Sequence, residues 1–206
     1  MGMRARLLLA ALVVTWTAAP VRAQWMATPY LGANVAGDLE FRRGGPGVSV
    51  AYLGHRLGFE LDVERYHHFF KDSHVANPDP GGRPNCAPGT IGPCTDINTD
   101  AIGVMGNLVA PFRIGDATKW LSYAAAGLGV MHAWFEHPDD RYDVSQNDLV
   151  FDVGAGVVRS FSDHVGLRGD LRYLRAPVDE TARRGRYFED YGFWRVTVGI
   201  TFGLLR

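Results

Sequence analysis

The sequence predicts an all-β fold, an eight-stranded antiparallel up-and-down transmembrane β-barrel. Three observations predict it. Polar and apolar residues alternate with a period of two in short segments, which is typical of strands. The links between these segments are alternately long and short. Glycine, 25 of 206 residues, also occurs inside apolar segments, where helices disfavour it and barrels use it.

The N-terminal segment, residues 1–23, is expected to be a cleaved secretory signal peptide, and residues 24–206 the barrel domain. Arg4 and Arg6 precede an apolar stretch that is too short to span a bilayer, and small residues mark a cleavage site after Ala23. No later apolar run has the length of a transmembrane helix. A mature chain that enters a membrane is therefore expected to do so as a barrel.

The eight expected strands share the alternating pattern. Their approximate ranges are 28–36, 46–54, 57–68, 100–110, 119–135, 149–159, 164–174 and 191–204. The third shows the pattern clearly, because Glu60, Asp62 and Glu64 alternate with apolar residues. The fifth is irregular, because residues 124–129 are small on both faces and leave its phase open.

The seventh and eighth strands repeat the pattern of the third. Arg168, Asp170 and Arg172 alternate with apolar residues in the seventh strand. Arg195 and Thr197 do so in the eighth. One apolar and one polar face per strand predicts a sheet whose two surfaces meet different environments.

The links between the strands alternate in length. Long polar links are expected at 37–45, 69–99, 136–148 and 175–190, and short ones at 55–56, 111–118 and 160–163. A transmembrane barrel has short turns at one rim and long loops at the other. Both termini are therefore expected at the short-turn rim.

The alternation is compatible with two barrels of opposite polarity. A soluble, lipocalin-like periplasmic barrel would have apolar side chains inside, whereas a transmembrane barrel would have polar ones inside. The third strand is acidic and the seventh mainly basic, so their charges can pair across a narrow lumen, which favours the second case. The expected lumen charge network consists of Glu60, Asp62, Glu64, Asp152, Arg168, Asp170, Arg172 and Arg195. An ion-paired plug is favoured over a proton or ion path.

Aromatic residues near the expected strand ends favour the same orientation, because membrane barrels carry aromatic girdles at both lipid interfaces. The expected girdle residues are Trp25, Tyr30, Tyr66, Phe69, Phe70, Trp120, Tyr123, Trp134, Phe135, Tyr187, Tyr191 and Trp194. The polar faces are also rich in glycine, which suits the crowded interior of a small barrel.

The last strand resembles the C-terminal assembly signal of bacterial outer-membrane barrels. Its polar residue, glycine, aromatic residue and final hydrophobe are Thr197, Gly199, Phe202 and Leu204. Through residues 30–33 and 125–130 the chain also resembles the small outer-membrane β-barrel family that includes the OmpA transmembrane domain and opacity-type proteins. The resemblance implies a bacterial outer-membrane location, contact with outer-membrane lipids and lipopolysaccharide, and insertion by the barrel-assembly machinery.

The long-loop rim holds the residues that metals favour. Cys86 and Cys94 lie in one long link, and in an exported protein they predict a disulfide that pins this loop; metal ligation is the weaker alternative. Histidines and acids near the rim are His67, His68, His74, His132, Glu136, His137, Asp139, Asp140 and Asp143. Their spacing matches no closed metal motif, so solvated loops are expected, with no metal and no cofactor.

No enzymatic motif is found in the sequence. It contains no Gly-x-Ser-x-Gly elbow, phosphate loop or His-Glu-x-x-His. Ser162, Asp163 and His164 are chain neighbours in one short link and cannot present three side chains to one substrate. The net charge of −1 gives no indication of a nucleic-acid partner.

The expected function is that of a non-enzymatic barrel that displays extracellular loops. Its role would be in envelope integrity, adhesion or surface interaction, with an extracellular ligand contacted through the loops. Eight strands enclose a space that side chains nearly fill, so a general diffusion pore is not expected. A narrow channel for small solutes or hydrophobic compounds and a lipid A-modifying enzyme remain as alternatives.

Overall fold

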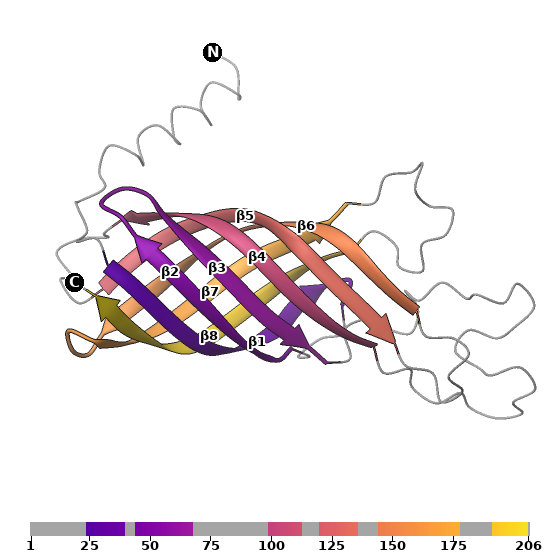
Figure 1. Cartoon of the computed structure of the whole chain (residues 1–206), viewed down its shortest axis with the longest axis horizontal. Helices are drawn as coiled ribbons and strands as arrows, with labels where there is room; N and C mark the ends of the chain where they lie inside the picture. Colours follow the sequence, from indigo (N-terminus) through magenta and orange to yellow (C-terminus); the bar gives the residue numbers. More distant parts are fainter. Residues whose placement is uncertain are drawn as a thin grey trace, which may run out of the picture.

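The computed structural model describes residues 24–39, 44–67, 99–112, 120–135, 144–177 and 191–205. Its strands are β1 (Gln24–Gly37), β2 (Pro46–Leu53), β3 (Gly58–Tyr66), β4 (Thr99–Phe112), β5 (Trp120–Phe135), β6 (Val144–Ser160), β7 (Val165–Ala176) and β8 (Tyr191–Leu205). Each strand pairs with the next, and β8 pairs with β1, so the sheet closes into a barrel (Figure 1). The predicted fold class is confirmed.

All eight strand pairs are antiparallel, which places both ends of the barrel segment at one rim. Trp25 at the start of β1 pairs with Leu205 at the end of β8. Two of the short turns at this rim close with backbone hydrogen bonds, from Gly54 N to Leu57 O at 3.2 Å and from Phe161 N to Val165 O at 2.9 Å. Among the described residues, no helix is long and apolar enough to cross a membrane.

Two strands begin at least four residues earlier than the sequence pattern predicts. β1 begins at Gln24 rather than at residue 28, and β6 begins at Val144 rather than at residue 149. Alternation cannot mark these ends, because residues 24–27 are mostly apolar on both faces and residues 145–148 are polar on both. Residues 144–150 of β6 pair with β5 and, within the described chain, have no partner on β7.

The outer wall of the barrel is apolar and its interior is polar. Leu61, Val153 and Val198 are 53%, 57% and 54% exposed on the wall. Glu60 and Thr197, which alternate with such residues, are only 2% and 4% exposed. This is the reverse of a soluble barrel, which needs a polar exterior, and it is the polarity of a transmembrane barrel.

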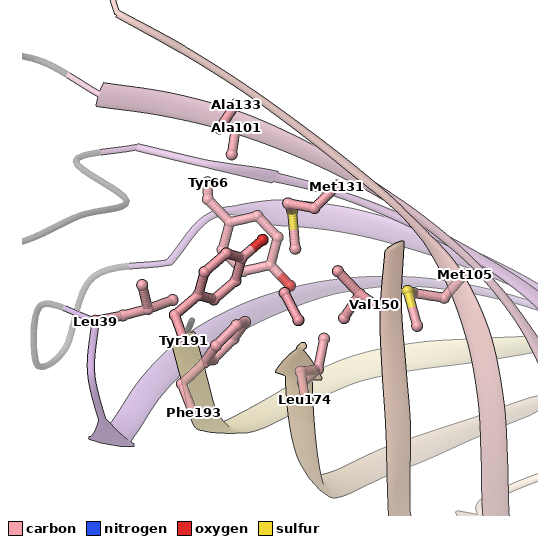
Figure 2. Close-up of a cluster of buried hydrophobic side chains, with 11 residues drawn as sticks. Leu39, Tyr66, Ala101, Met105, Met131, Ala133, Val150, Leu174, Tyr191 and Phe193 are labelled. Carbon is pink, nitrogen blue, oxygen red and sulfur yellow. The ribbon is translucent and has the colours of Figure 1, made fainter. Parts of the chain in front are cut away.

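The lumen contains three layers along the barrel axis, and two of them are apolar. The outer apolar layer, at the long-loop rim, consists of Leu39, Tyr66, Ala101, Met105, Met131, Ala133, Val150, Leu174, Ala176, Tyr191 and Phe193 (Figure 2). The inner apolar layer, at the short-turn rim, consists of Met26, Ala51, Leu53, Val109, Tyr123, Ala125 and Val158. Between them lies a charged layer.

Leu39 reaches the outer apolar layer from beyond the end of β1. Gly37, with a φ of 116°, turns the chain in a conformation that favours glycine. Asp38 then donates its backbone N–H to Gly192 O at 3.0 Å and accepts the Gly192 N–H on Oδ2 at 2.8 Å. These two bonds hold the segment across the edge of β8, and Leu39 packs inward near Tyr191 and Phe193 (Figure 2).

The expected aromatic girdles are wrong in part. Tyr30, Tyr66, Tyr123 and Tyr191 are buried inside the barrel and do not face lipid. The hydroxyls of the first three reach buried charges there, which an apolar wall could not supply. Trp25, Trp120, Trp134 and Trp194 occupy outward positions of their strands. Phe69, Phe70, Tyr187 and the side chain of Phe135 lie outside the described residues.

Candidate functional site

The charged layer of the lumen is the candidate site. Its eight predicted members are Glu60, Asp62 and Glu64 from β3, Asp152 from β6, Arg168, Asp170 and Arg172 from β7, and Arg195 from β8. All eight are buried, with at most 7% of their surface exposed. The strands position them because inward residues recur at every second position, so β3 and β7 each deliver three charges to the layer, whereas β6 and β8 deliver one each.

The first cluster of this layer centres on Arg168. Its Nη2 lies 2.9 Å from Glu60 Oε1, and its Nε lies 2.9 Å from Asp170 Oδ2. The guanidinium also donates to Ser49 Oγ at 3.1 Å and to Tyr123 Oη at 2.6 Å. Arg168 therefore joins β7 to β2, β3 and β5 across the interior.

Arg172 extends this cluster to the neighbouring wall. Its Nη2 lies 2.8 Å from Glu60 Oε2 and 3.2 Å from Asp170 Oδ1, and its Nη1 lies 3.1 Å from Asp152 Oδ2. In the amide orientation that its neighbours require, Asn107 donates to Asp152 and accepts from Arg172 Nη1, both at 2.7 Å. Acids from three strands thus meet at one guanidinium.

A second cluster centres on Arg195. Its Nη1 lies 2.5 Å from Glu64 Oε2 and 3.2 Å from Asp62 Oδ1, and it donates to Tyr66 Oη at 3.2 Å. Tyr30 Oη donates to Asp62 Oδ2 at 2.8 Å, and the Arg195 guanidinium lies 5.9 Å from the centre of the Tyr30 ring. This cluster joins β8 to β1 and β3.

The site contains hydroxyl groups that sequence reasoning did not assign to it. Ser49 and Tyr123 bind Arg168, and Tyr30 and Tyr66 join the Arg195 cluster. Tyr66 could have been found, because it lies two positions after Glu64 and therefore on the same face of β3. Tyr123 lies in the strand whose phase the sequence left open.

The charged layer carries more negative than positive charge. Its predicted members are three arginines and five carboxylates, which gives a formal balance of 3 − 5 = −2. Each of the five carboxylates nevertheless lies within 3.2 Å of an arginine nitrogen. Burial of charge is tolerated when each group is paired and hydrogen-bonded in this way.

The rim histidines do not converge on one point in the described part of the chain. His67 Nδ1 lies 3.3 Å from Asp100 Oδ1 on β4, whereas His132 Nδ1 lies 2.7 Å from Asn147 Oδ1 on β6. Among the described residues, no group of three or more His, Cys, Asp or Glu side chains could hold a metal ion. The other rim candidates, His68, His74, Glu136, His137, Asp139, Asp140 and Asp143, lie outside the described residues, as do Cys86 and Cys94.

The residues of the expected assembly signal occupy both faces of β8. Thr197 points inward and donates to Asp170 Oδ2 at 3.3 Å. Gly199 also points inward, close to Tyr30. Phe202 projects from the wall and is 43% exposed. The side chain of Leu204 is not among those that the structure describes.

A closed eight-stranded antiparallel barrel with an apolar wall and a paired charged interior defines an outer-membrane-type β-barrel protein. The family model described as the outer membrane protein beta-barrel domain matches residues 7–202, and the chain belongs to that family. This confirms the resemblance seen in the sequence and gives the bacterial outer membrane as the location. A comparison with curated proteins finds no match.

Solved structures of small outer-membrane barrels are similar to this chain. Neisserial surface protein A (NspA) has a TM-score of 0.55 at 16% identity, covering 88% of this chain and 96% of its own. The N-terminal β-barrel domain of Pseudomonas aeruginosa OprF has a TM-score of 0.54 at 15% identity, covering 89% and 100%. The attachment invasion locus protein Ail of Yersinia pestis, in complex with the heparin analogue sucrose octasulfate, has a TM-score of 0.51 at 13% identity, covering 89% and 100%. At these identities the likeness shows the fold alone.

Proposed function

We propose that this protein is a closed, non-enzymatic scaffold in the outer membrane that displays its long loops for adhesion or other surface contact and contributes to envelope integrity. One observation carries the proposal: the lumen holds a paired charged layer between two apolar layers. Water and ions would have to displace all three layers to pass. The functional contacts are therefore expected in the loops, because loops on a rigid scaffold commonly carry binding residues.

The link 69–99 is the proposed contact surface. It is the longest of the four long links, and a disulfide between Cys86 and Cys94 would restrict its conformations. Ail, which has the same fold, was solved with a sulfated heparin analogue. Sulfated polysaccharide is therefore a suitable first probe for this chain.

The test is adhesion of cells that express the barrel to heparin-coated surfaces. Deletion of residues 75–97 is expected to abolish the adhesion that the intact chain confers. Deletion of residues 179–187 in the fourth long link, at the same rim, serves as the matched control and should leave adhesion intact. Equal adhesion by the intact chain and the 75–97 deletion, with both in the outer membrane, would refute the role of this loop.

Conductance separates the scaffold from a narrow channel. The protein in planar bilayers is expected to give no steady single-channel steps, because the three lumen layers close the path. Reproducible conductance steps from the folded barrel would refute the closed scaffold and show that the protein is a channel. Mass spectrometry of lipid A from cells with and without the protein tests the enzyme alternative, and identical spectra are expected.

Export is proposed to remove residues 1–23. The basic residues Arg4 and Arg6, the short apolar stretch after them and the small residues that end at Ala23 support this. The intact mass of the protein from the membrane fraction should correspond to residues 24–206. A mass that includes Arg4 and Arg6 would show that the leader is retained.

A further inference from the structure

The outer wall of the barrel carries aromatic side chains at the short-turn rim. Those in outward positions or in the rim turn are Trp25, Tyr52, Phe59, Trp120, Phe161 and Phe202, here called the inner girdle. Trp25 packs at 5.2 Å from Tyr52 and 5.5 Å from Phe59, measured between ring centres. Such girdles lie at the level of the lipid headgroups, and the short turns of bacterial outer-membrane barrels face the periplasm. The inner girdle therefore marks the headgroups of the periplasmic leaflet.

Arg159, the last outward-facing residue of β6, lies within the inner girdle. Its guanidinium carbon is 5.4 Å from the ring centre of Trp120 and 5.7 Å from that of Phe161. Trp120 is also its direct partner in the β5–β6 ladder. The two rings are 45% and 63% exposed, so they hold the cation at the lipid-facing surface.

The described residues supply no carboxylate partner for Arg159. The other two arginines that project from the described wall, Arg65 and Arg175, lie at the opposite rim. Arg65 is already paired with Asp100 at 3.0 Å. A guanidinium that stacks on aromatic rings directs its N–H groups sideways, in the planar fork that matches two phosphate oxygens.

The wall beside Arg159 suits an acyl chain. The next outward residues along β6 toward the membrane centre are Val157, Ala155 and Val153, all exposed and apolar. We propose that Arg159, held by Trp120 and Phe161, binds the phosphodiester group of a glycerophospholipid in the periplasmic leaflet. The acyl chains of this lipid then lie along the apolar face of β6.

The test is native mass spectrometry of the full-length barrel refolded in octyl glucoside. Three probes are compared: phosphatidylglycerol, a diacylglycerol glucoside that lacks phosphate, and inorganic phosphate. The unmodified chain should retain phosphatidylglycerol in preference to the glucoside. Arg159→Gln should weaken phosphatidylglycerol binding about tenfold, the loss of a charge-assisted hydrogen-bond pair. Arg175→Gln, which removes a cation from the same wall at the opposite rim, should leave binding unchanged.

A boiling-dependent gel shift checks that every variant is folded, and Arg159→Lys separates charge from shape. The lysine variant should bind more weakly than the unmodified chain and more strongly than Arg159→Gln, because it keeps the charge and loses the fork. Equal binding by the unmodified chain and Arg159→Gln would overturn the proposal. So would equal retention of the glucoside, or displacement of the lipid by inorganic phosphate, which would indicate a site for free anions.

Discussion

Arg172 ties together acids from three strands of the barrel. Glu60 on β3, Asp152 on β6 and Asp170 on β7 all lie within 3.2 Å of its guanidinium, which is 1% exposed. A buried pair of this kind adds little net stability compared with a well-packed apolar pair. Removal of Arg172, however, leaves Asp152 without its arginine partner, and Glu60 and Asp170 keep only Arg168. Single substitutions in this network should therefore have large effects on the stability of the barrel.

Arg172→Met is expected to lower the free energy of unfolding by about 3–5 kcal/mol, because three buried carboxylates lose their shared cation. Arg175→Met, a change of the same chemistry on the exposed side of the same strand, should cost less than about 1 kcal/mol, because the contacts of an exposed charge add little to stability. Urea titration of the barrel in detergent micelles, followed by gel mobility, measures both. Coinciding midpoints for the two variants would show that the network does not contribute to stability.

Gly156 faces the lumen next to Tyr123. A methyl group at this position would overlap the tyrosine hydroxyl and ring, which bind Arg168 and Asp170. Gly156→Ala should therefore destabilise the barrel by about 1–3 kcal/mol, the usual cost of overpacking a core. Gly106→Ala is the control, because the nearest atom to its added carbon is 3.8 Å away. If both variants unfold at the same urea concentration, the crowding at Gly156 is unimportant.

At the scale of the element, β8 combines packing and recognition on opposite faces. Thr197 and Gly199 face the lumen, whereas Phe202 projects toward the lipid. Another protein can recognise a side chain on the outward face during membrane insertion. Such a side chain need not contribute to packing in the lumen. We therefore expect substitutions on the lumen face and substitutions on the outward face of β8 to show their effects in different assays.

Phe202→Ala should reduce the amount of folded barrel in the outer membrane while leaving spontaneous refolding into micelles intact, because only cells contain the assembly machinery. Val198→Ala, a truncation on the same face of β8, should behave as the unmodified chain in both assays. Quantified gel mobility of unboiled samples gives the folded fraction. A parallel loss of folding in micelles would assign Phe202 to stability instead of recognition.

The strands were predictable where the two faces of the sheet differ. Glu60, Asp62 and Glu64 alternate with apolar residues, so both the element and its inward face follow from period two. The four buried tyrosines were misplaced because an aromatic ring with a hydroxyl suits either a lipid interface or a hydrogen-bonded interior. Pairing between Arg195 and Glu64 was foreseeable only in outline, since it depends on which strands lie across the lumen from each other.

At the scale of the whole molecule, closure leaves no edge strand in the described barrel. Each of the eight strands has partners on both sides, and arginines bridge opposite walls through the lumen. A detergent that solvates the wall therefore finds no edge strand at which to begin unfolding. The barrel should therefore resist sodium dodecyl sulfate until it is heated.

Unboiled protein from the membrane fraction is expected to migrate differently from boiled protein on the same gel. The Arg172→Met variant should lose the shift at a lower temperature than the unmodified chain. The control is the periplasmic fraction, which should contain little of the protein. Identical mobility before and after boiling, with the protein in the periplasm, would contradict a membrane-embedded barrel.

The unequal described lengths of β6 and β7 have a consequence for immune recognition. Among the described residues, 144–150 of β6 pair with β5 and have no partner on β7, and their outward side chains at 145 and 147 are polar. The link at 136–143 therefore joins two strands, β5 and β6, that extend past the described end of β7. An antibody raised against this link should therefore label intact cells.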